Sequence, residues 1–173
     1  MDETNDPVLI PEPLLEELGK LFGNKFTAMR QEGMDQLREN LIHIVESGEQ
    51  QNNEVLMEAI DSGEAAERYW AATWLGVNRV GRARTKVAAL TSDPDPSVRI
   101  AANLALYKID PSYDPIPALG QEVNHRNLIV GMYAMGAIEQ TGIRNEAVKA
   151  IAEITAQSKY EFTKRYGNNL KGL

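Results

Sequence analysis

Apolar residues recur along the chain at the three- and four-residue spacing of amphipathic helices, and Gly, Pro and Asp interrupt them at short intervals. In the first part, Leu37, Leu41 and Ile44 fall on one face of a helix that we predict from about Met34 to Ser47. The sustained alternation of apolar and polar positions that is typical of strands is weak throughout. The pattern therefore predicts an all-α protein.

From Glu54 onward, a short helix, a turn, a longer helix and a second turn recur as one unit. We place four such units, the last one incomplete, at residues 54–77, 81–109, 115–142 and 145–166. The longer helices align when Arg68, Arg99 and Gly131 are superposed, with spacings of 31 and 32 residues.

This alignment superposes small residues and, one turn later, larger aliphatic ones. The small set is Ala71, Ala102 and Ala134, and the large set is Leu75, Leu106 and Ile138. Small side chains allow neighbouring helices to approach closely, and large ones fill the space between layers. We therefore expect both sets to be buried where successive hairpins pack.

The turns contain residues that begin and end helices. Asp95 is suited to be an N-cap, and Pro96 suits the first helical position, where its missing N–H costs nothing. Gly142 stands at a C-cap position, and Asn145 can cap the helix that follows. These residues predict helix boundaries within the repeat.

A single hairpin cannot bury its apolar face, whereas stacked hairpins share one continuous core. The period therefore predicts a solenoid of about three to four helical hairpins over residues 52–173. We expect residues 1–51, with a further helix over 14–22, to form an acidic helical cap that packs with the repeats as one domain.

The segment from Asp93 to Ala102 resembles the HEAT-repeat consensus, in which an Asp in the turn precedes a Val-Arg pair at the start of the second helix. Asp93 and Val98-Arg99 match that pattern, and Arg68 matches one unit earlier. Gly131 stands where the third arginine is expected. The resemblance implies a right-handed α-α superhelix of the HEAT/ARM-like kind.

Residues 52–142 are also similar to the HEAT-like segment appended to many bacterial sulfatases of the arylsulfatase type, on the strings RYWAATWLG, DPDPSVRIAANLAL and YAMGAIEQTG. The catalytic motif of that family, Cys or Ser followed by x-Pro-x-Arg, does not occur. The resemblance implies a detached or truncated accessory region, or an independent relative, whose partner is a protein or peptide such as a sulfatase-type catalytic domain.

Charge and composition limit the functional classes. The chain has no cysteine, which excludes disulfides, thiolate metal sites and a cysteine nucleophile. Its net charge of −7 opposes binding to nucleic acid or anionic lipid. Residues 1–61 carry four Lys/Arg against fourteen Asp/Glu, and the remainder carries fourteen against eleven, so an anionic partner is expected to meet the second part.

No apolar run approaches the roughly 20 residues that a membrane helix needs. The first residues are acidic and polar, so a secretory signal is not predicted in this chain. The expected location is periplasmic or extracellular if the chain belongs to a sulfatase, and cytoplasmic otherwise. The oligomeric state is open.

Five residues are candidates for contact with a partner: Trp70, Trp74, Tyr133, Arg68 and Arg99. Trp70 and Trp74 lie one turn apart on one helix face, so they form either a binding stripe or packing within the core. Arg68 and Arg99 either contact a partner or form, with residues such as Asp93, an Asp–Arg ladder between repeats.

A basic cluster surrounds one turn and opens a helix, at Arg79, Arg82, Arg84 and Lys86. It is a weaker candidate for binding a phosphate, a sulfate or an acidic peptide, because N–H groups at a helix start also attract anions. The alternative is a solvated turn that offsets the acidic first part of the chain.

The two histidines, His43 and His125, have no second histidine or carboxylate cluster at ligand spacing, so no metal site or cofactor is predicted. We expect His43 to be partly buried. No catalytic motif is recognisable. The sequence therefore predicts a non-catalytic interaction or scaffolding module. The alternatives are a HEAT-like enzyme of the DNA-glycosylase or bilin-lyase type, and a dimerising structural unit.

Overall fold

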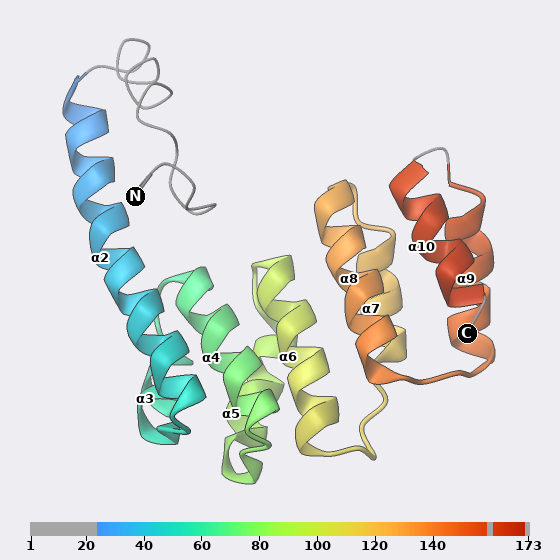
Figure 1. Cartoon of the computed structure of the whole chain (residues 1–173), viewed down its shortest axis with the longest axis horizontal. Coiled ribbons are helices and arrows are strands. Elements are labelled where there is room, and N and C mark those ends of the chain that lie inside the picture. Colours follow the sequence, from blue (N-terminus) through green and yellow to red (C-terminus); the bar gives the residue numbers. More distant parts are fainter. Residues whose placement is uncertain (1–23, 159–160, 172–173) are drawn as a thin grey trace. The chain divides into compact units, whose positions relative to one another are not determined.

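The computed structural model describes residues 24–158 and 161–171, and all regular structure in these residues is helical (Figure 1). The predicted helix over 14–22 lies outside them. The long helix α2 (Asn24–Glu49) contains the helix that the sequence predicted within it. Backbone contacts divide the chain into two compact units between His43 and Ile44. The second unit contains the repeats, and the predicted domain boundary at residue 51 stays a prediction.

The helices of the second unit follow the predicted repeats. They are α3 (Asn53–Ala59), α4 (Ala65–Val77), α5 (Arg84–Ala89), α6 (Pro96–Ile109), α7 (Ile116–Val123), α8 (Leu128–Thr141), α9 (Glu146–Ala156) and α10 (Glu161–Lys171). Two short 3₁₀ turns, Gly81–Ala83 and Leu90–Ser92, flank α5. The all-α class is confirmed, and a shorter helix precedes a longer one in the first three hairpins, whereas α9 and α10 have 11 residues each.

The predicted caps are confirmed by their geometry. The Asp95 carboxylate accepts hydrogen bonds from the backbone N–H groups of Ser97 at 2.8 Å and Val98 at 3.4 Å, and Pro96 is the first residue of α6. The Asn145 side chain likewise accepts from the N–H of Val148, two residues into α9. Gly142 ends α8 with a φ of +68°, a left-handed conformation that glycine adopts without steric cost.

Helix α10 extends beyond the residue at which the sequence placed the end of the last repeat. The sequence placed it at residue 166, before Gly167, but α10 continues through Gly167 to Lys171. A Cβ atom built on Gly167 would lie 2.4 Å from the backbone nitrogen of Ala156. This glycine therefore allows α10 to approach α9 closely, and it does not terminate the helix.

The second helices of the hairpins pack on one another in the order α4, α6, α8 and α10, and each also contacts the first helix of its own hairpin (Figure 1). The three superposed alanines, Ala71, Ala102 and Ala134, are fully buried. The larger set, Leu75, Leu106 and Ile138, is buried as well. The expected burial of both sets is therefore confirmed at all six residues.

Close helix approach explains where the repeat departs from its own pattern. A Cβ on Gly131 would lie 2.8 Å from the carbonyl oxygen of Val123, at the end of α7. Gly131 occupies the position of Arg68 and Arg99 in the alignment, and there is no room for a side chain there. The third unit therefore lacks the arginine because α8 starts in contact with its partner helix.

The buried apolar residues form two clusters that meet at α6. One cluster extends from Ile44 to Leu106, and the other from Ile100 to Ala152. Helix α6 contributes to both and packs against α4 on one side and α8 on the other. None of the helices in the described part of the chain is both long enough and apolar enough to cross a membrane.

Candidate functional site

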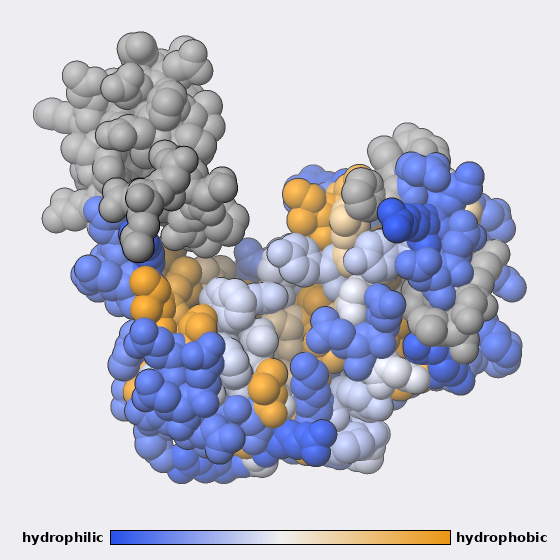
Figure 2. Space-filling model, viewed as in Figure 1, coloured by the Kyte–Doolittle hydropathy of each residue, from blue (hydrophilic) through white to orange (hydrophobic). Residues whose placement is uncertain are grey.

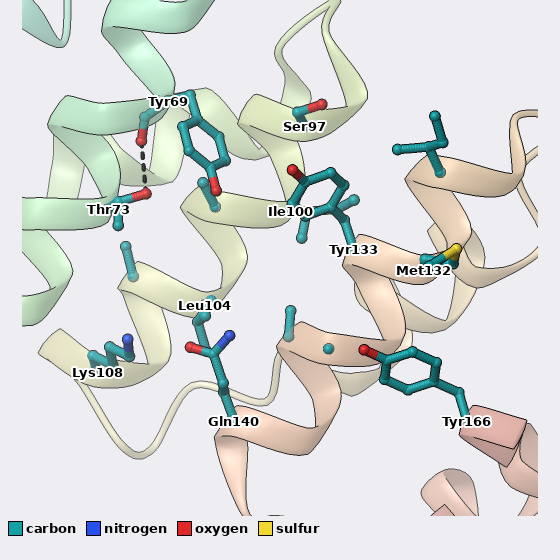
Figure 3. A pocket seen from close by; sticks show the side chains of 15 residues that line it. Tyr69, Thr73, Ser97, Ile100, Leu104, Lys108, Met132, Tyr133, Gln140 and Tyr166 are labelled. Atoms are coloured by element: carbon teal, nitrogen blue, oxygen red, sulfur yellow. Dashed lines mark hydrogen bonds between the residues drawn. The ribbon is translucent and has the colours of Figure 1, made fainter. Parts of the chain in front are cut away.

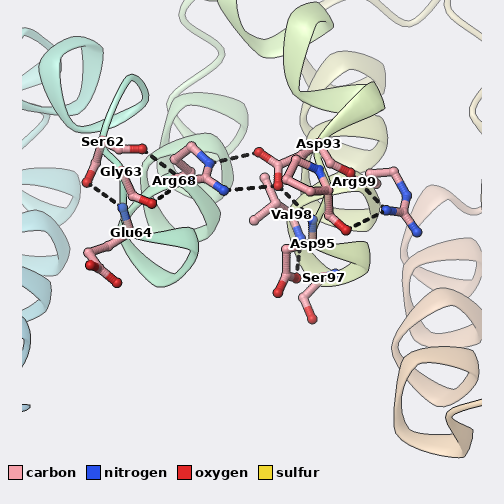
Figure 4. A network of polar contacts seen from close by, with 10 residues as sticks. Ser62, Gly63, Glu64, Arg68, Asp93, Asp95, Ser97, Val98 and Arg99 are labelled. Carbon is pink, nitrogen blue, oxygen red and sulfur yellow. Dashed lines mark hydrogen bonds and ion pairs between the residues drawn. The ribbon is translucent and has the colours of Figure 1, made fainter. Parts of the chain in front are cut away.

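Arg68, at the start of α4, is fixed by contacts within the chain (Figure 4). Its Nε and Nη2 donate to the two carboxylate oxygens of Asp93 at 2.7 and 3.0 Å. Its Nη1 donates to the carbonyl oxygens of Ser62 and Gly63, in the turn before α4, at 2.9 Å each. The Asp93 side chain is only 4% exposed, so this ion pair ties α4 to the turn before α6.

Arg99, at the start of α6, repeats the same arrangement one layer later. Its Nη1 donates to the carbonyl oxygens of Asp93 and Pro94, which are 31 residues beyond Ser62 and Gly63. Its Nε donates to the Glu122 carboxylate on α7 at 2.6 Å. Arg99 thus contacts the backbone of Asp93 and pairs with Glu122, whereas the carboxylate of Asp93 pairs with Arg68.

We call these two arrangements the arginine clamps. Burial alone would raise the pKa of Asp93, but hydrogen bonds from Arg68 and from the Asp95 N–H outweigh it, so the pKa is lowered. The hydrogen bond to Asp93 raises the pKa of Arg68, and the bond to Glu122 raises that of Arg99. Both guanidinium groups are therefore used in joining layers, and contact with a partner stays a prediction for them.

The two tryptophans occupy different environments. Trp74 packs against Gly48, because a Cβ atom on that glycine would lie 2.2 Å from the indole ring. Its Nε1 is buried without a hydrogen-bond partner. Trp70 is 36% exposed and meets the ring of Tyr69 edge-on, with ring centroids 5.3 Å apart. The two rings therefore do not form one exposed stripe.

A groove of about 440 Å³ lies over α6, between α4 and α8 (Figure 3). Helix α6 forms its floor along the whole helix, from Ser97 through Ile100 and Leu104 to Lys108. Helices α4 and α8 contribute its sides, and Tyr166 reaches it from α10. We call this site the α6 groove.

The α6 groove is built from equivalent positions of successive repeats. Tyr69, Ile100 and Met132 superpose in the alignment that the sequence suggests, as do Thr73, Leu104 and Gly136. Tyr133 is the only one of the five partner candidates that lines the groove. Trp70 lies one residue from the lining position Tyr69, a rotation of about 100° around the helix. The sequence analysis singled out the aligned positions of Trp70 and Tyr133. It missed the aligned positions one residue earlier, Tyr69, Ile100 and Met132, which all line the groove.

The described lining of the α6 groove carries hydroxyl and amide groups but a single charged side chain. Tyr69 and Tyr133 extend into it from opposite sides above Ile100 (Figure 3). Burial raises the pKa of the Tyr69 hydroxyl, with a smaller contribution from Tyr133. Burial lowers the pKa of the Lys108 ammonium, at the other end of the floor. No acidic residue is present among the described residues that line the groove.

Exposed apolar side chains flank the groove at the start of α8. Ile129 is 61% exposed and Tyr133 is 54% exposed, and both line the groove. Leu128, just before Ile129, is 37% exposed. Figure 2 shows apolar surface gathered over the start of α8. Such exposed apolar area on an otherwise polar protein is typical of an interaction surface.

The basic cluster is mostly engaged in ion pairs between repeats. Lys86 pairs with Asp61 and also donates to the carbonyl oxygen of Met57 at 3.0 Å. Arg82 pairs with Glu54, and Arg84 pairs with Asp110 at 3.2 Å. Arg79 lies in the preceding turn with a φ of +52° and is exposed. In these three ion pairs the cations already have carboxylate partners from the chain. Anion binding at this cluster stays a prediction.

The histidines lie apart. His43 is exposed, so the expectation of partial burial was wrong. His125 accepts a hydrogen bond from the N–H of Asn127 at 3.1 Å through its Nδ1 and shapes the turn before α8. Within residues 24–158 and 161–171, no group of three or more His, Cys, Asp or Glu residues is arranged to hold a metal ion.

No family model matches the chain, and no curated protein matches it. The similarity to HEAT repeats and to the sulfatase-appended segment therefore depends on the residues quoted above. Both relations stay predictions.

Proposed function

We propose that the chain is a non-catalytic interaction module that binds a protein segment in the α6 groove. In this proposal the hairpins form a right-handed solenoid of the HEAT-like kind, and the longer helices present its binding face. The observation that carries the proposal is that the groove is lined by equivalent positions of α4, α6 and α8. A stack of similar hairpins forms such a continuous groove wherever its longer helices lie side by side.

The dimensions of the groove suit a short peptide segment. Its floor extends from Ser97 to Lys108, which corresponds to roughly 16 Å along the helix axis at 1.5 Å per residue. That length matches about three turns of a bound helix or about five residues of an extended chain. Ile100, Leu104 and Met132 offer apolar contacts along it, as expected of a groove that binds apolar side chains.

The chemistry of the groove favours binding over catalysis. Its described lining contains tyrosines, small residues and one lysine, but no carboxylate and no histidine. Histidine is the side chain that most often serves in general acid–base catalysis, and carboxylates, lysine and tyrosine also serve; of these, the groove offers tyrosines and one lysine. A glycosylase-type enzyme would in addition need a basic groove, and three of the four cations of the basic cluster, Arg82, Arg84 and Lys86, are paired with carboxylates.

The partner to test first is a sulfatase-type catalytic domain, because residues 52–142 are similar to the segment that accompanies such domains. The test mixes the purified chain with a purified arylsulfatase-type catalytic domain and measures binding by calorimetry. Binding that disappears when the groove is filled supports this partner. Binding that does not depend on the groove contradicts the proposed site.

A substitution at Gly136 tests the groove itself. A Cβ on Gly136 meets no atom within 4 Å, so Gly136→Tyr would fill the groove without disturbing the core. Peptides are first selected from a random phage-displayed library on the wild-type protein. We expect Gly136→Tyr to weaken the selected peptides by at least about tenfold, because the new ring occupies their space.

Gly81→Tyr is the matched control, since Gly81 is also unobstructed and lies outside the groove. Both variants should melt at the wild-type temperature and keep the helical circular dichroism spectrum. Equal peptide affinity for wild type and Gly136→Tyr would show that the groove is not the binding site.

The exposed apolar residues at the start of α8 favour a second candidate, a dimerising unit. Ile129 and Tyr133 would then be buried between two copies of the chain. Light scattering over a concentration series distinguishes the two candidates. A mass that doubles with concentration, and that returns to one chain in Ile129→Glu, would support the dimer.

A further inference from the structure

Lys108 is the only cation among the described residues that line the α6 groove. It lies in the last turn of α6, and Figure 3 shows its side chain at the end of the groove that also contains Leu104 and Gln140. Within the described part of the chain, its ammonium has no ion pair or hydrogen bond. Arg82, Arg84 and Lys86 differ from it, because each is paired with a carboxylate.

An ammonium that is half-buried without a counter-ion has lost part of its hydration, and no carboxylate among the described residues offsets that loss. The burial that lowers the pKa of Lys108 reflects this loss. The described lining of the groove contains no acidic residue, so none of these residues supplies a carboxylate to Lys108. A carboxylate from outside would restore the lost interaction and would be less screened than an ion pair on the surface.

The exposed apolar surface extends beyond the groove. This favours a protein segment over a small amphiphilic acid as the ligand of the groove. Leu128, Ile129 and Trp70 are exposed near its edges, and only Ile129 of these lines the groove. A fatty acid lying over α6 would leave Leu128 and Trp70 uncovered. A segment that belongs to a larger protein can cover them together with the groove.

We infer that the segment bound in the α6 groove is an apolar peptide with one Asp or Glu, whose carboxylate pairs with the ammonium of Lys108. This inference depends on the proposed function and adds the chemistry of the partner to it. In such a complex the apolar side chains of the peptide fill the space between Tyr69, Leu104 and Met132. The acidic residue fixes the register of the peptide, since Lys108, at one end of the groove, is the one cation among its described lining residues.

The experiment selects peptides from the same random phage-displayed library on wild type, Lys108→Met and Lys108→Glu. Wild type should enrich peptides with Asp or Glu at one fixed position among apolar residues. Lys108→Met should lose that enrichment, and Lys108→Glu should replace it with Lys or Arg. For a single selected peptide, changing its acid to the amide should weaken binding roughly tenfold to wild type and have little effect on Lys108→Met.

Lys149→Met is the matched control, because Lys149 lies on α9, outside the groove, and pairs with Glu146. It should select the same acidic peptides as wild type. Peptides that require the groove but show no acidic preference would overturn the inference and leave the proposed function intact.

Two other outcomes would overturn the inference for different reasons. If no selected peptide is sensitive to Gly136→Tyr, the proposed function fails, and the inference fails with it. If the library yields no binder but dodecanoate binds wild type and not Lys108→Met, the groove holds a small amphiphilic acid and the protein partner is wrong. Circular dichroism of each variant confirms that the helices are retained.

Discussion

At the scale of single residues, the arginine clamps show how one side chain can join two layers. Arg68 and Arg99 each use Nη1 on the turn of their own hairpin and Nε on a carboxylate of the next. The planar guanidinium group, with five donors in fixed directions, suits this double contact better than a lysine would. The two clamps differ in the residue that supplies the carboxylate, Asp93 in one and Glu122 in the other.

Asp93→Asn tests the more buried clamp. The amide keeps an acceptor for the Asp95 N–H but removes the charge that balances Arg68. We expect the free energy of unfolding to fall by about 2–3 kcal/mol at pH 7, because a largely buried cation loses its partner. Denaturant unfolding followed by circular dichroism measures the change. Asp61 has an exposed carboxylate that pairs with Lys86, so Asp61→Asn should lower the free energy of unfolding by less than about 1 kcal/mol.

The same pair predicts a pH dependence. The pKa of Asp93 is lower in the folded chain than its ordinary value of 3.8, so its contribution is complete above that value and is lost as pH falls through the folded pKa. The difference in stability between wild type and Asp93→Asn should therefore shrink as pH falls below about 4. A difference that stays constant down to pH 2 would show that the charge of Asp93 does not stabilise the fold.

Residues that act on the local backbone could be predicted from the sequence, whereas side-chain partners could not. Asp95, Asn145 and Gly142 act within one turn of a helix, so their neighbours in sequence determine their roles. The sequence suggested a ladder of Arg68 and Arg99 with residues such as Asp93, but it did not show which arginine the Asp93 carboxylate binds, and that arginine is Arg68, 25 residues earlier. Which side chains meet across two layers depends on how the layers pack in space, and the neighbouring residues in the sequence do not show it.

At the scale of the elements, glycine marks the points of closest helix approach. A Cβ on Gly76 would lie 2.6 Å from the Cα atom of Ala105, where α4 meets α6. Gly136 is also within a longer helix, but a Cβ there has open space. The two positions therefore differ in packing, although both glycines lie inside a helix.

Gly76→Ala and Gly136→Ala should change stability in opposite directions. The first should lower the free energy of unfolding by about 1–3 kcal/mol, because the backbone of α6 must move away. The second should raise it by about 0.5–1 kcal/mol through the better helix propensity of alanine. Thermal and denaturant unfolding measure both. Equal effects of the two substitutions would contradict the close contact between α4 and α6.

The order and type of the helices could be predicted because capping residues and apolar spacing are local signals. The face that each helix turns toward the groove could not be predicted in the same way. Trp70 and Tyr69 are neighbours in sequence, and both are aromatic, yet only Tyr69 lines the groove. Which of two adjacent residues points to the groove depends on the rotation of α4 against α6, and that is set by packing.

At the scale of the whole molecule, stability is expected to be shared unequally among the layers. Helix α6 is covered by α4 on one side and by α8 on the other. Helix α10, in the last hairpin, makes its main contacts with α8 and α9. In a stack of hairpins, a layer with two neighbours opens less readily than one with a single neighbour. The second core cluster extends only as far as α9 in its fully buried residues.

Amide hydrogen exchange should therefore be slowest in α6. We expect exchange of the α10 amides at least about tenfold faster than that of the α6 amides under native conditions. Mass spectrometry of peptides from residues 96–109 and 161–171 measures the difference. Equal protection in the two peptides would indicate that the second unit opens only as a whole.

The all-α class followed from the sequence because periodicity is a global signal that no single substitution removes. The α6 groove did not, because its volume depends on how far apart α4 and α8 stand on either side of α6. Gly136 and Ala137 show this dependence, since their small size contributes to the groove but is equally consistent with close packing.

The arginine clamps also give the row of hairpins a direction. Arg68 and Arg99 each reach forward along the chain, to an acid of the following hairpin, and Gly131 closes the series because its helix has no room for a third. A hairpin continues this series only if it carries both an arginine and an acid at these places. A gene that duplicated the middle hairpin would keep a clamp at the new junction, because Arg99 would face the copy of Asp93 as Arg68 faces Asp93, whereas a copy of the third hairpin would add no clamp, because it carries Gly131.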